Sequence, residues 1–377
     1  MPFKALGLPL YLINALSENG IDQPYPIQIE SIPSILSKKD VIGIAQTGSG
    51  KTESYVLPIL KNLIGGIRSK NRHIKVLVIV PTRELAIQVC KVFDRYSKVL
   101  PEKVKTLAVF GGVSINVQML ELQGVSILVA TPGRLLELVE SNAVHLSDTE
   151  TIVIDEADKM LNLGFRDEMN VLLNLLPKKR QNLLFSATLT DEITNINSVF
   201  FKNPIIIKVE NKSDDLELIK QTAYLVTNEK KGPLLRYLIN TNELNQILVF
   251  TSTVYSAINV TDKLLRNGIT ASSIHSKKSQ LARIEALDSF KSGEIRVLVA
   301  TDLLSRGIDI RFLPYVINYE LPRSPKDFIH RIGRTGRAES TGEAISFITA
   351  ADVHHFNIIQ KKIKKEVLII DSSSFNL

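Results

Sequence analysis

The chain has 377 residues, of which 44% are hydrophobic, so it is long enough for two or three domains with apolar cores and is not a disordered chain. Its single cysteine excludes an intramolecular disulfide, and no Cys or His spacing is typical of a zinc site, which favours a reducing compartment. The net charge of +7, from 46 basic and 39 acidic residues, permits a polyanionic partner without establishing one.

Short apolar runs rich in β-branched residues recur along the first half of the chain, separated by stretches that suit helices. Continuous apolar runs are typical of parallel strands buried on both faces. A second series follows, so we predict two α/β domains, each with a mainly parallel sheet flanked by helices. The predicted strands cover residues 41–45, 76–80, 127–130, 152–154 and 183–185 in the first series, and 223–226, 247–250, 297–300, 316–319 and 344–348 in the second.

A polar segment, ENKSDDLE at residues 210–217, lies between the two series and lacks an apolar periodicity, which is typical of a linker. We therefore predict one domain over residues 1–210, a linker over residues 211–220 and a second domain over residues 221–377. No fixed-period repeat is visible, although two domains of one fold need not share sequence. The tail at residues 371–377 is expected to fray.

The sequence AQTGSGKT, at residues 45–52, follows a predicted strand and precedes a helix-compatible segment. Glycines in such a loop let backbone N–H groups hold phosphates, while Lys51 can reach the terminal phosphates and Thr52 can ligate Mg²⁺. Ala45 departs from the strict pattern, which has glycine at that position. A glycine-rich turn without a ligand is the simpler interpretation, but the spacing and the flanking elements favour a phosphate site.

An acidic sequence, VIDEAD at residues 153–158, ends another predicted strand. Open α/β sheets bind ligands at the carboxyl ends of their strands. Asp155 can hold Mg²⁺ there, and Glu156 can orient or deprotonate an attacking water. An acidic cluster alone is more often a solvated helix start, but together with the phosphate loop it indicates nucleotide hydrolysis.

A basic sequence, HRIGRTGR at residues 330–337, lies in the second predicted domain. Its arginines at positions 331, 334 and 337 could form a solvated basic face. Alternatively, Arg334 and Arg337 act as arginine fingers that neutralise charge developing on the γ-phosphate. The second interpretation explains why two domains are needed.

Ten short motifs follow one another along the chain: YPIQ (25–28), AQTGSGKT, PTRELA (81–86), GG (111–112), TPGR (131–134), DEAD (155–158), SAT (186–188), QLAR (280–283), ATDLLSRGID (300–309) and HRIGRTGR. In this order they resemble the motifs of the DEAD-box RNA helicases of helicase superfamily 2. The resemblance runs from Phe3 to about Ile348, and the chain is similar to the compact bacterial branch of the family. The resemblance implies two tandem RecA-like domains, and in this family Ala45 is itself a usual residue.

The resemblance implies that Gln28 recognises the adenine of ATP through its carboxamide and that Phe3 packs near the base. Ile21 and Tyr25 depart from the family pattern, so base contact is expected while the stacking stays open. The implied catalytic residues are Lys51, Asp155, Glu156, Arg334 and Arg337, and Thr52 and Asp155 would hold Mg²⁺ through ATP. The implied ATP-binding residues are Phe3, Gln28, Thr47, Gly48, Ser49, Gly50, Lys51, Thr52, Asp309, Arg334 and Arg337.

Further family residues are implied in coupling and in RNA binding. Ser186 and Thr188 resemble the coupling motif, and His330 resembles the residue that joins the nucleotide site to the interdomain interface. The RNA-binding loops would hold phosphates and sense 2′-hydroxyls without recognising bases. The implied RNA-binding residues are Pro81, Thr82, Arg83, Gly112, Thr131, Pro132, Gly133, Arg134, Thr251, Gln280, Arg283, Thr301 and Arg306.

The resemblance implies an ATP-dependent RNA helicase that binds RNA sequence-independently and couples RNA-stimulated ATP hydrolysis to local, non-processive unwinding or remodelling of RNA–protein complexes. Expected cofactors are ATP and Mg²⁺, with RNA and ribosomal or RNA-decay complexes as partners of a cytoplasmic monomer without a membrane segment. A DNA helicase and an ATP-gated RNA clamp are alternatives, although Gln28 and the DEAD sequence argue against the first. KKIKK, at residues 361–365, is either a solvated helix side or an auxiliary RNA contact.

Overall fold

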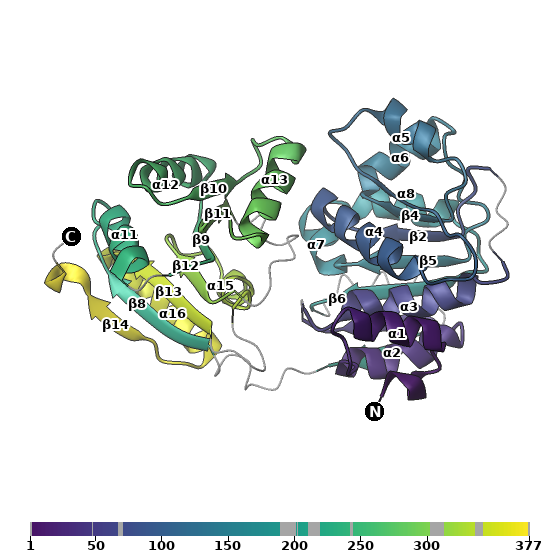
Figure 1. Cartoon of the computed structure of the whole chain (residues 1–377), viewed down its shortest axis with the longest axis horizontal. Helices are drawn as coiled ribbons and strands as arrows, with labels where there is room; N and C mark the ends of the chain where they lie inside the picture. The colour runs from purple at the N-terminus through teal and green to yellow at the C-terminus, as the bar shows by residue number, and fades with distance from the viewer. Residues whose placement is uncertain are drawn as a thin grey trace. The chain divides into compact units, whose positions relative to one another are not determined.

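The computed structural model describes residues 2–46, 48–66, 71–188, 201, 203–209, 219–241, 244–301, 313–335 and 342–375. Internal contacts divide the chain into two compact units, Met1–Asn211 (unit 1) and Lys212–Leu377 (unit 2). Each unit is built around one sheet with helices on both faces (Figure 1). Within the described ranges, no helix combines the length and the apolar character that a membrane crossing requires.

The sheet of unit 1 has seven parallel strands in the order β3-β4-β2-β5-β6-β1-β7. Its central strands β2, β4, β5 and β6 are buried along their whole length, as their apolar runs predict. The strands are β1 (Val41–Ile44), β2 (Val76–Ile79), β3 (Thr106–Val109), β4 (Ile127–Ala130), β5 (Thr151–Asp155), β6 (Gln181–Ser186) and β7 (Ile205–Lys208).

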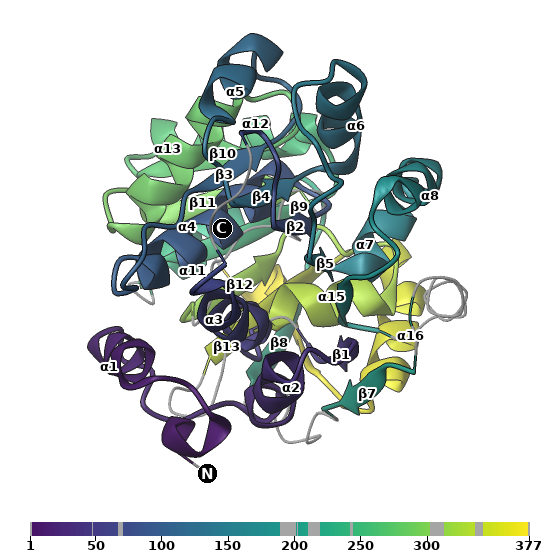
Figure 2. The same cartoon turned by 90° about the vertical axis from the view of Figure 1, so that its right-hand side faces the viewer.

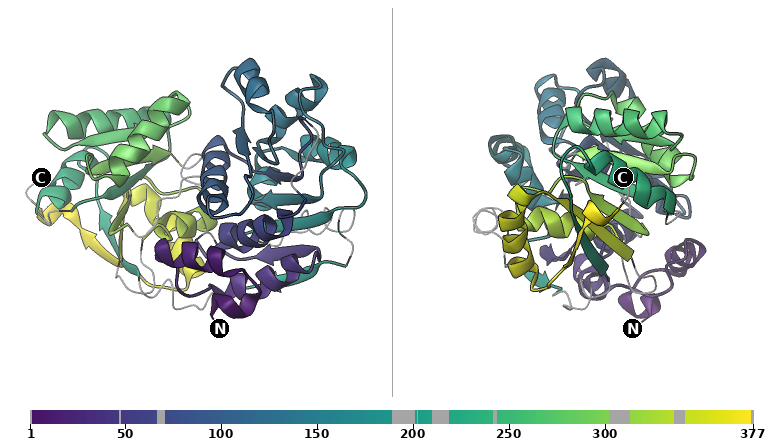
Figure 3. Two further views of the ribbon diagram at one scale, coloured as in Figure 1. Left: turned by 45° about the vertical axis from the view of Figure 1, so that its right-hand side comes forward. Right: turned by 90° about the vertical axis from the view of Figure 1, so that its left-hand side faces the viewer.

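Alternate residues of these strands enter two separate cores, one on each face of the sheet. Val76 and Val78 pack in the first core, whereas Leu77 and Ile79 pack in the second. The first core is covered by η1 (Phe3–Leu6), α1 (Leu10–Glu18), α2 (Pro26–Leu36), α3 (Lys51–Leu63) and α4 (Arg83–Ser97). The second is covered by α5 (Ile115–Glu121), α6 (Pro132–Glu140), α7 (Ala157–Asn162) and α8 (Arg166–Leu175). Figure 2 shows α2 beside α3, and Figure 3 shows α1 and η1, in purple, near the N-terminus.

The sheet of unit 2 also has seven parallel strands, in the order β10-β11-β9-β12-β13-β8-β14. The strands are β8 (Ile219–Leu225), β9 (Ile247–Thr251), β10 (Ala271–Ile274), β11 (Val297–Thr301), β12 (Tyr315–Asn318), β13 (Gly342–Ile348) and β14 (Leu368–Asp371). One face is covered by α11 (Lys231–Thr241) and α12 (Val254–Arg266). The other is covered by α13 (Gln280–Lys291), α15 (Pro325–Ile332) and α16 (Val353–Ile363). These two sheets confirm the predicted α/β class.

The strands absent from the prediction are β3, β7, β10 and β14, which are the four edges of the two sheets. An edge strand pairs on one side only and is less completely covered by helices, so its sequence need not be a continuous apolar run. The burial of β14 illustrates this, because no residue in it is fully buried.

Two boundaries differ from the expectation. β8 begins at Ile219, which is 1% exposed and pairs with Gly342, so the last two residues of the predicted linker belong to a strand. The fraying expected at the tail is wrong for residues 371–375. Phe375 packs its ring 5.9 Å from that of Tyr224 and 5.3 Å from that of Tyr237, which anchors the segment after β14.

Candidate nucleotide site and nucleic-acid interface

The loop between β1 and α3 holds the predicted phosphate-binding residues in a glycine-dependent conformation. Gly48 and Gly50 have φ angles of +85° and +80°, a region that side chains disfavour. Lys51 begins α3, is only 7% exposed and donates from Nζ to the carbonyl oxygen of Ala45 at 2.8 Å. Such a loop at a helix N-terminus presents backbone amides to an anion. Thr47 lies outside the described residues.

Gln28 joins α2 to this loop. Its Oε1 accepts a hydrogen bond from the backbone N–H of Tyr25 at 3.0 Å, and its Nε2 donates to the carbonyl oxygen of Gly50 at 3.1 Å. A Cβ at Gly50 would lie 2.8 Å from the ring of Tyr25, so the tyrosine also borders the loop. Phe3 instead packs in the first core and is 3% exposed, so the structure places its ring in the interior.

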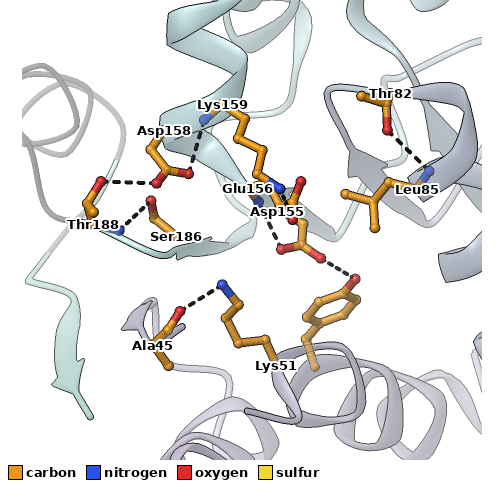
Figure 4. A network of polar contacts seen from close by, with 11 residues as sticks. Ala45, Lys51, Thr82, Leu85, Asp155, Glu156, Asp158, Lys159, Ser186 and Thr188 are labelled. Carbon is orange, nitrogen blue, oxygen red and sulfur yellow. Dashed lines mark hydrogen bonds and ion pairs between the residues drawn. The ribbon is translucent and has the colours of Figure 1, made fainter. Parts of the chain in front are cut away.

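Asp155 ends the central strand β5 with a buried carboxylate. Its Oδ2 accepts from the hydroxyl of Tyr55 at 2.9 Å, and its Oδ1 accepts from the backbone N–H of Glu156 at 2.9 Å (Figure 4). Burial raises the pKa of Asp155 to about 6, against the opposing effect of the Lys51 ammonium. The sequence analysis missed Tyr55, although its position four residues after Lys51 places both on one face of α3.

Glu156 occupies a strained position directly after the strand. Its φ of +53° is uncommon for a residue other than glycine, and it caps the N-terminus of α7. Its Oε1 forms an ion pair with Nζ of Lys159 at 2.6 Å. Its Oε2 is buried and, within the described part of the chain, has no hydrogen-bond partner. A buried acceptor without a partner is costly, so this oxygen is available to a ligand or a water.

The residues of the SAT sequence contact the acidic cluster. Thr188 donates from Oγ1 to Oδ2 of Asp158 at 3.0 Å, and its backbone N–H donates to Oγ of Ser186 at 3.4 Å (Figure 4). The other oxygen of Asp158 accepts from the backbone N–H of Lys159 at 3.0 Å. The end of β6 and the start of α7 are thus joined through side chains.

The donor set fits an Mg²⁺ ion that arrives with a nucleotide. Among the described residues, no group of three or more His, Cys, Asp or Glu could hold a metal ion by itself. Mg²⁺ usually takes one or two protein ligands and completes its shell with waters and substrate phosphates. Asp155 and Thr52 would supply two oxygen ligands of this kind, and both side chains lie near the hydroxyl of Tyr55.

Two motifs predicted to face RNA meet in unit 1. Thr82 caps α4, with Oγ1 accepting from the backbone N–H of Leu85 at 3.3 Å (Figure 4). The guanidinium of Arg83 lies directly against Gly112, whose φ is +81°. A side chain at position 112 would be strained at this φ, which explains the glycine, and the guanidinium of Arg83 would have to move to make room for it.

Arg134 lies inside the unit rather than on its surface. It is 7% exposed, and its guanidinium donates to Glu137 at 2.8 Å, to Gln118 at 2.9 Å and to the carbonyl oxygen of Val113 at 2.9 Å. Arg134 thus ties α6 to the loop that follows Gly112. The neighbouring residues of its motif vary in exposure: Thr131 and Pro132 are buried and Gly133 is partly exposed.

The arginines of HRIGRTGR that the structure describes are buried, so a solvated basic face is not what they form. Arg331 is 2% exposed and donates to Oδ1 of Asn318 at 3.1 Å and to the carbonyl oxygen of Glu320 at 2.6 Å. Arg334 is 9% exposed, and His330 is half-buried. Arg337, Arg306 and Asp309 lie outside the described residues.

The remaining predicted RNA contacts of unit 2 are spread over strand ends and α13. Thr251 and Thr301 end β9 and β11 and are 0% and 7% exposed. Arg283 is 7% exposed, and Gln280 begins α13 with its side chain outside the described set. In KKIKK, the three exposed lysines are at positions 361, 362 and 364, while Lys365 donates to the carbonyl oxygen of Ile219 at 2.9 Å.

A glycine loop after the first strand and carboxylates at the end of a central parallel strand define a phosphate-loop nucleotide-binding protein. Comparison with family models narrows this class. Residues 25–196 match the DEAD/DEAH box helicase model, and residues 229–339 match the helicase conserved C-terminal domain.

Comparison with individual proteins points to the same helicase family. The chain is 37% identical over 366 residues to the DEAD-box ATP-dependent RNA helicase CshA of Geobacillus kaustophilus, covering 97% of this chain and 77% of that protein. It is 37% identical over 349 residues to the ATP-dependent RNA helicase DeaD of Buchnera aphidicola, covering 92% of this chain but only 57% of that protein. The chain therefore belongs to the DEAD-box ATP-dependent RNA helicase family.

Solved structures support the fold. A DEAD box protein from Methanococcus jannaschii is 34% identical with a TM-score of 0.57, covering 98% of this chain and 99% of that one. Dbp5 of S. cerevisiae, bound to RNA and ADP BeF3, is 29% identical with a TM-score of 0.84, covering 98% and 95%. Both matches extend over the two units.

Proposed function

We propose that the chain is an RNA-stimulated ATPase that uses ATP hydrolysis to unwind or remodel RNA. The observation that carries the proposal is the buried Oε2 of Glu156, which has no hydrogen-bond partner among the described residues. It lies beside Asp155 at the end of β5, in the unit that holds the glycine-dependent phosphate loop. The relatives named ATP-dependent RNA helicases, and the RNA-bound structure of Dbp5, support the same activity. Because the chain spans 57% of DeaD, the activity of that whole protein comes to this chain as a proposal.

In the proposed reaction, Gln28 holds the adenine edge, and Nζ of Lys51 exchanges the carbonyl of Ala45 for the terminal phosphates. Mg²⁺ bound with the nucleotide, held by Thr52 and Asp155, would neutralise phosphate charge. Oε2 of Glu156 accepts the proton of the attacking water while Lys159 holds the other oxygen in place. Phosphate charge that develops during transfer is neutralised by Arg334 and Arg337, with Asp309 on the ribose.

RNA binding is proposed to depend on backbone contacts rather than on base recognition. Arg83, exposed Gly112 and Gly133 would meet phosphates and 2′-hydroxyls, with Arg134 supporting the loop from inside. The contact between Asp158 and Thr188 would couple the nucleotide state to RNA. Unwinding is then local and non-processive, performed by a cytoplasmic monomer that acts in ribosomal or RNA-decay complexes.

The test is ATP turnover of the purified chain, measured alone, with single-stranded RNA and with DNA of the same sequence. We expect stimulation by RNA only. Equal stimulation by DNA would favour the DNA helicase instead. Unwinding of a short RNA duplex with ATP, compared with a non-hydrolysable analogue, separates a helicase from an ATP-gated clamp, which would hold RNA without opening the duplex.

Base recognition is tested separately with Gln28→Ala. Loss of the carboxamide should reduce the preference for ATP over GTP, because the remaining contacts are to phosphate and ribose. The measurement is the ratio of the two kcat/KM values. If the unmodified protein already uses GTP and ATP equally, Gln28 does not recognise adenine.

A further inference from the structure

Tyr55 is a fully buried residue of α3 whose hydroxyl points at the acidic cluster. Its ring packs 5.3 Å from the ring of Phe185 and 6.3 Å from that of Phe93. Two aromatic neighbours in a close-packed core restrict the ring, so the position of the hydroxyl is set by packing in the first core. From this position it donates to Oδ2 of Asp155 at 2.9 Å.

The hydroxyl serves as a hydrogen-bond donor to the acidic cluster. A phenol has a single O–H bond to donate, and this one is directed at the carboxylate of Asp155. The other oxygen of Asp155 is held by the backbone N–H of Glu156 at 2.9 Å. Two donors from two different elements therefore determine the rotation of a carboxylate that is 3% exposed.

Tyr55 also belongs to the helix that carries the phosphate-binding residues. Lys51 and Tyr55 are four residues apart, so α3 presents an ammonium and a phenol on the same face, and Thr52 interacts with the same hydroxyl. A single helix thus holds the groups for the phosphates and the donor for the carboxylate on β5. Any displacement of α3 relative to β5 would disturb both together.

We propose that Tyr55 is a positioning residue, which orients Asp155 so that the Mg²⁺–nucleotide complex meets a preformed ligand. The inference rests on the proposed function, because it assigns Asp155 to the metal. Without the hydroxyl, Oδ2 of Asp155 would lose its donor in a buried site, and the carboxylate would have to be oriented at the moment of binding. Tyr55 touches neither the nucleotide nor the attacking water in this scheme.

The test is Tyr55→Phe in the full chain, with equilibrium binding of a fluorescent ATP analogue measured over a titration of Mg²⁺ and in the presence of EDTA. We expect affinity at saturating Mg²⁺ to fall about 10-fold or more, the usual effect of losing a hydrogen bond to a charged group. Affinity in EDTA should be unchanged, because the phenylalanine keeps the ring packing. A general structural defect would lower both.

The control is Tyr96→Phe. Tyr96 is 0% exposed, and its hydroxyl is buried without a hydrogen-bond partner among the described residues, so the same deletion removes no contact to the site. Its nucleotide affinity should equal that of the unmodified chain with and without Mg²⁺. Thermal unfolding of both variants shows whether either has lost stability.

A double-mutant cycle with Asp155→Asn decides whether Tyr55 acts through Asp155. In that background, Tyr55→Phe should have no further effect on the Mg²⁺ dependence. Equal Mg²⁺ dependence in Tyr55→Phe and the unmodified chain, or a full additional loss in the double variant, overturns the inference. Absence of Mg²⁺-dependent binding in the unmodified chain overturns the proposed function instead.

Discussion

The two sheets have the same strand order, yet the glycine loop and the acidic sequence predicted to bind the nucleotide both lie in unit 1. Counting strands from the start of each unit, both run 3-4-2-5-6-1-7, because each label in the second sheet is seven higher than its counterpart in the first. The helix after the first strand is α3 in unit 1 and α11 in unit 2. Because the architecture is the same, the connections at equivalent strand ends can be compared directly.

After the first strand, the units differ in their glycines rather than in their lysines. Unit 1 has Gly48 and Gly50 in left-handed conformations before Lys51. Unit 2 has VTNEK at residues 226–230, without glycine, before Lys231, which also begins a helix. Lys231 is 5% exposed, and its Nζ lies 5.9 Å from the centre of the Tyr319 ring. We therefore expect that a buried lysine at the start of a helix does not make a phosphate site by itself, because such a site needs backbone amides that glycines make accessible.

After the fifth strand, the difference is in how acidic side chains are satisfied. In unit 2, Glu320 follows β12, and its carboxylate accepts from the backbone N–H of Ser252 at 2.5 Å and from Oγ of Ser256 at 2.7 Å. In unit 1, Oε2 of Glu156 is buried without a partner among the described residues. The structural acid has both oxygens bonded within the protein, whereas the proposed catalytic acid keeps one for the reaction.

The largest expected effect comes from Glu156→Gln. If Glu156 takes the proton from water, RNA-stimulated turnover should fall on the order of 10²-fold or more, with ATP and RNA binding retained. Glu320→Gln is the matched change in unit 2 and should leave turnover within about 2-fold, because its oxygens accept from the backbone N–H of Ser252 and the hydroxyl of Ser256 in unit 2. Steady-state ATPase rates and equilibrium binding of both variants check this. A large loss of turnover in Glu320→Gln as well would contradict the proposed difference between a catalytic Glu156 and a structural Glu320.

Arg331→Met should have the next largest effect, on stability rather than on chemistry. The substitution leaves the oxygens of Asn318 and Glu320 without their buried donor and removes a guanidinium centred 5.0 Å from the Phe250 ring. We expect the free energy of unfolding of unit 2 to fall by about 2 kcal/mol. Arg323→Met, at an exposed position in the same unit, should change the free energy of unfolding by less than about 0.5 kcal/mol. Urea unfolding of the two variants compares them, and similar midpoints would contradict a structural role for Arg331.

The pKa of Asp155 predicts a smaller, pH-dependent effect. Burial raises it from 3.8 to about 6, so the folded chain binds this proton more tightly than the unfolded chain does. The resulting stability is fully present below about pH 4 and is lost as the pH rises through 6. Asp155→Asn should therefore stabilise the ligand-free protein at pH 7.5, by about 1 kcal/mol or more, and the advantage should shrink towards pH 5. Thermal unfolding at both pH values measures this gain in stability. A gain that does not change with pH would mean that burial does not raise the pKa of Asp155.

Sequence patterns predicted the interior of each sheet better than its edges. A central strand such as β4 is apolar at every position because both faces are covered, and its run is visible in the sequence. β10 reads ASSI and β14 reads LIID, which single-sequence patterns do not separate from loops or helix ends. Their assignment depends on a neighbouring strand that is distant in the sequence.

Within the candidate site, the motif residues were predictable but their environments were not. Lys51, Asp155 and Glu156 are named by the motifs, and their clustering follows from parallel strands ending at one edge. The burial of Arg134 and Arg331 depends on partners contributed by other elements, so an arginine in a motif could equally be exposed. Tyr55 was missed for the same reason, because an aromatic residue four positions after Lys51 is more often part of a core than a donor to a carboxylate.

The smallest expected effect tests the glycine argument directly. Lys231→Met removes a buried ammonium, whose pKa burial lowers, from the position in unit 2 that corresponds to Lys51 in unit 1. Since no glycine loop precedes it, we expect ATP affinity to change by less than about 2-fold, and stability by less than about 1 kcal/mol because methionine fills a similar volume. Lys51→Met should instead abolish measurable phosphate-dependent binding. Fluorescent nucleotide titration compares the two variants. A comparable loss of affinity in Lys231→Met would indicate that the segment between β8 and α11 also binds phosphate. The glycines before Lys51 would then not explain the difference between the two units.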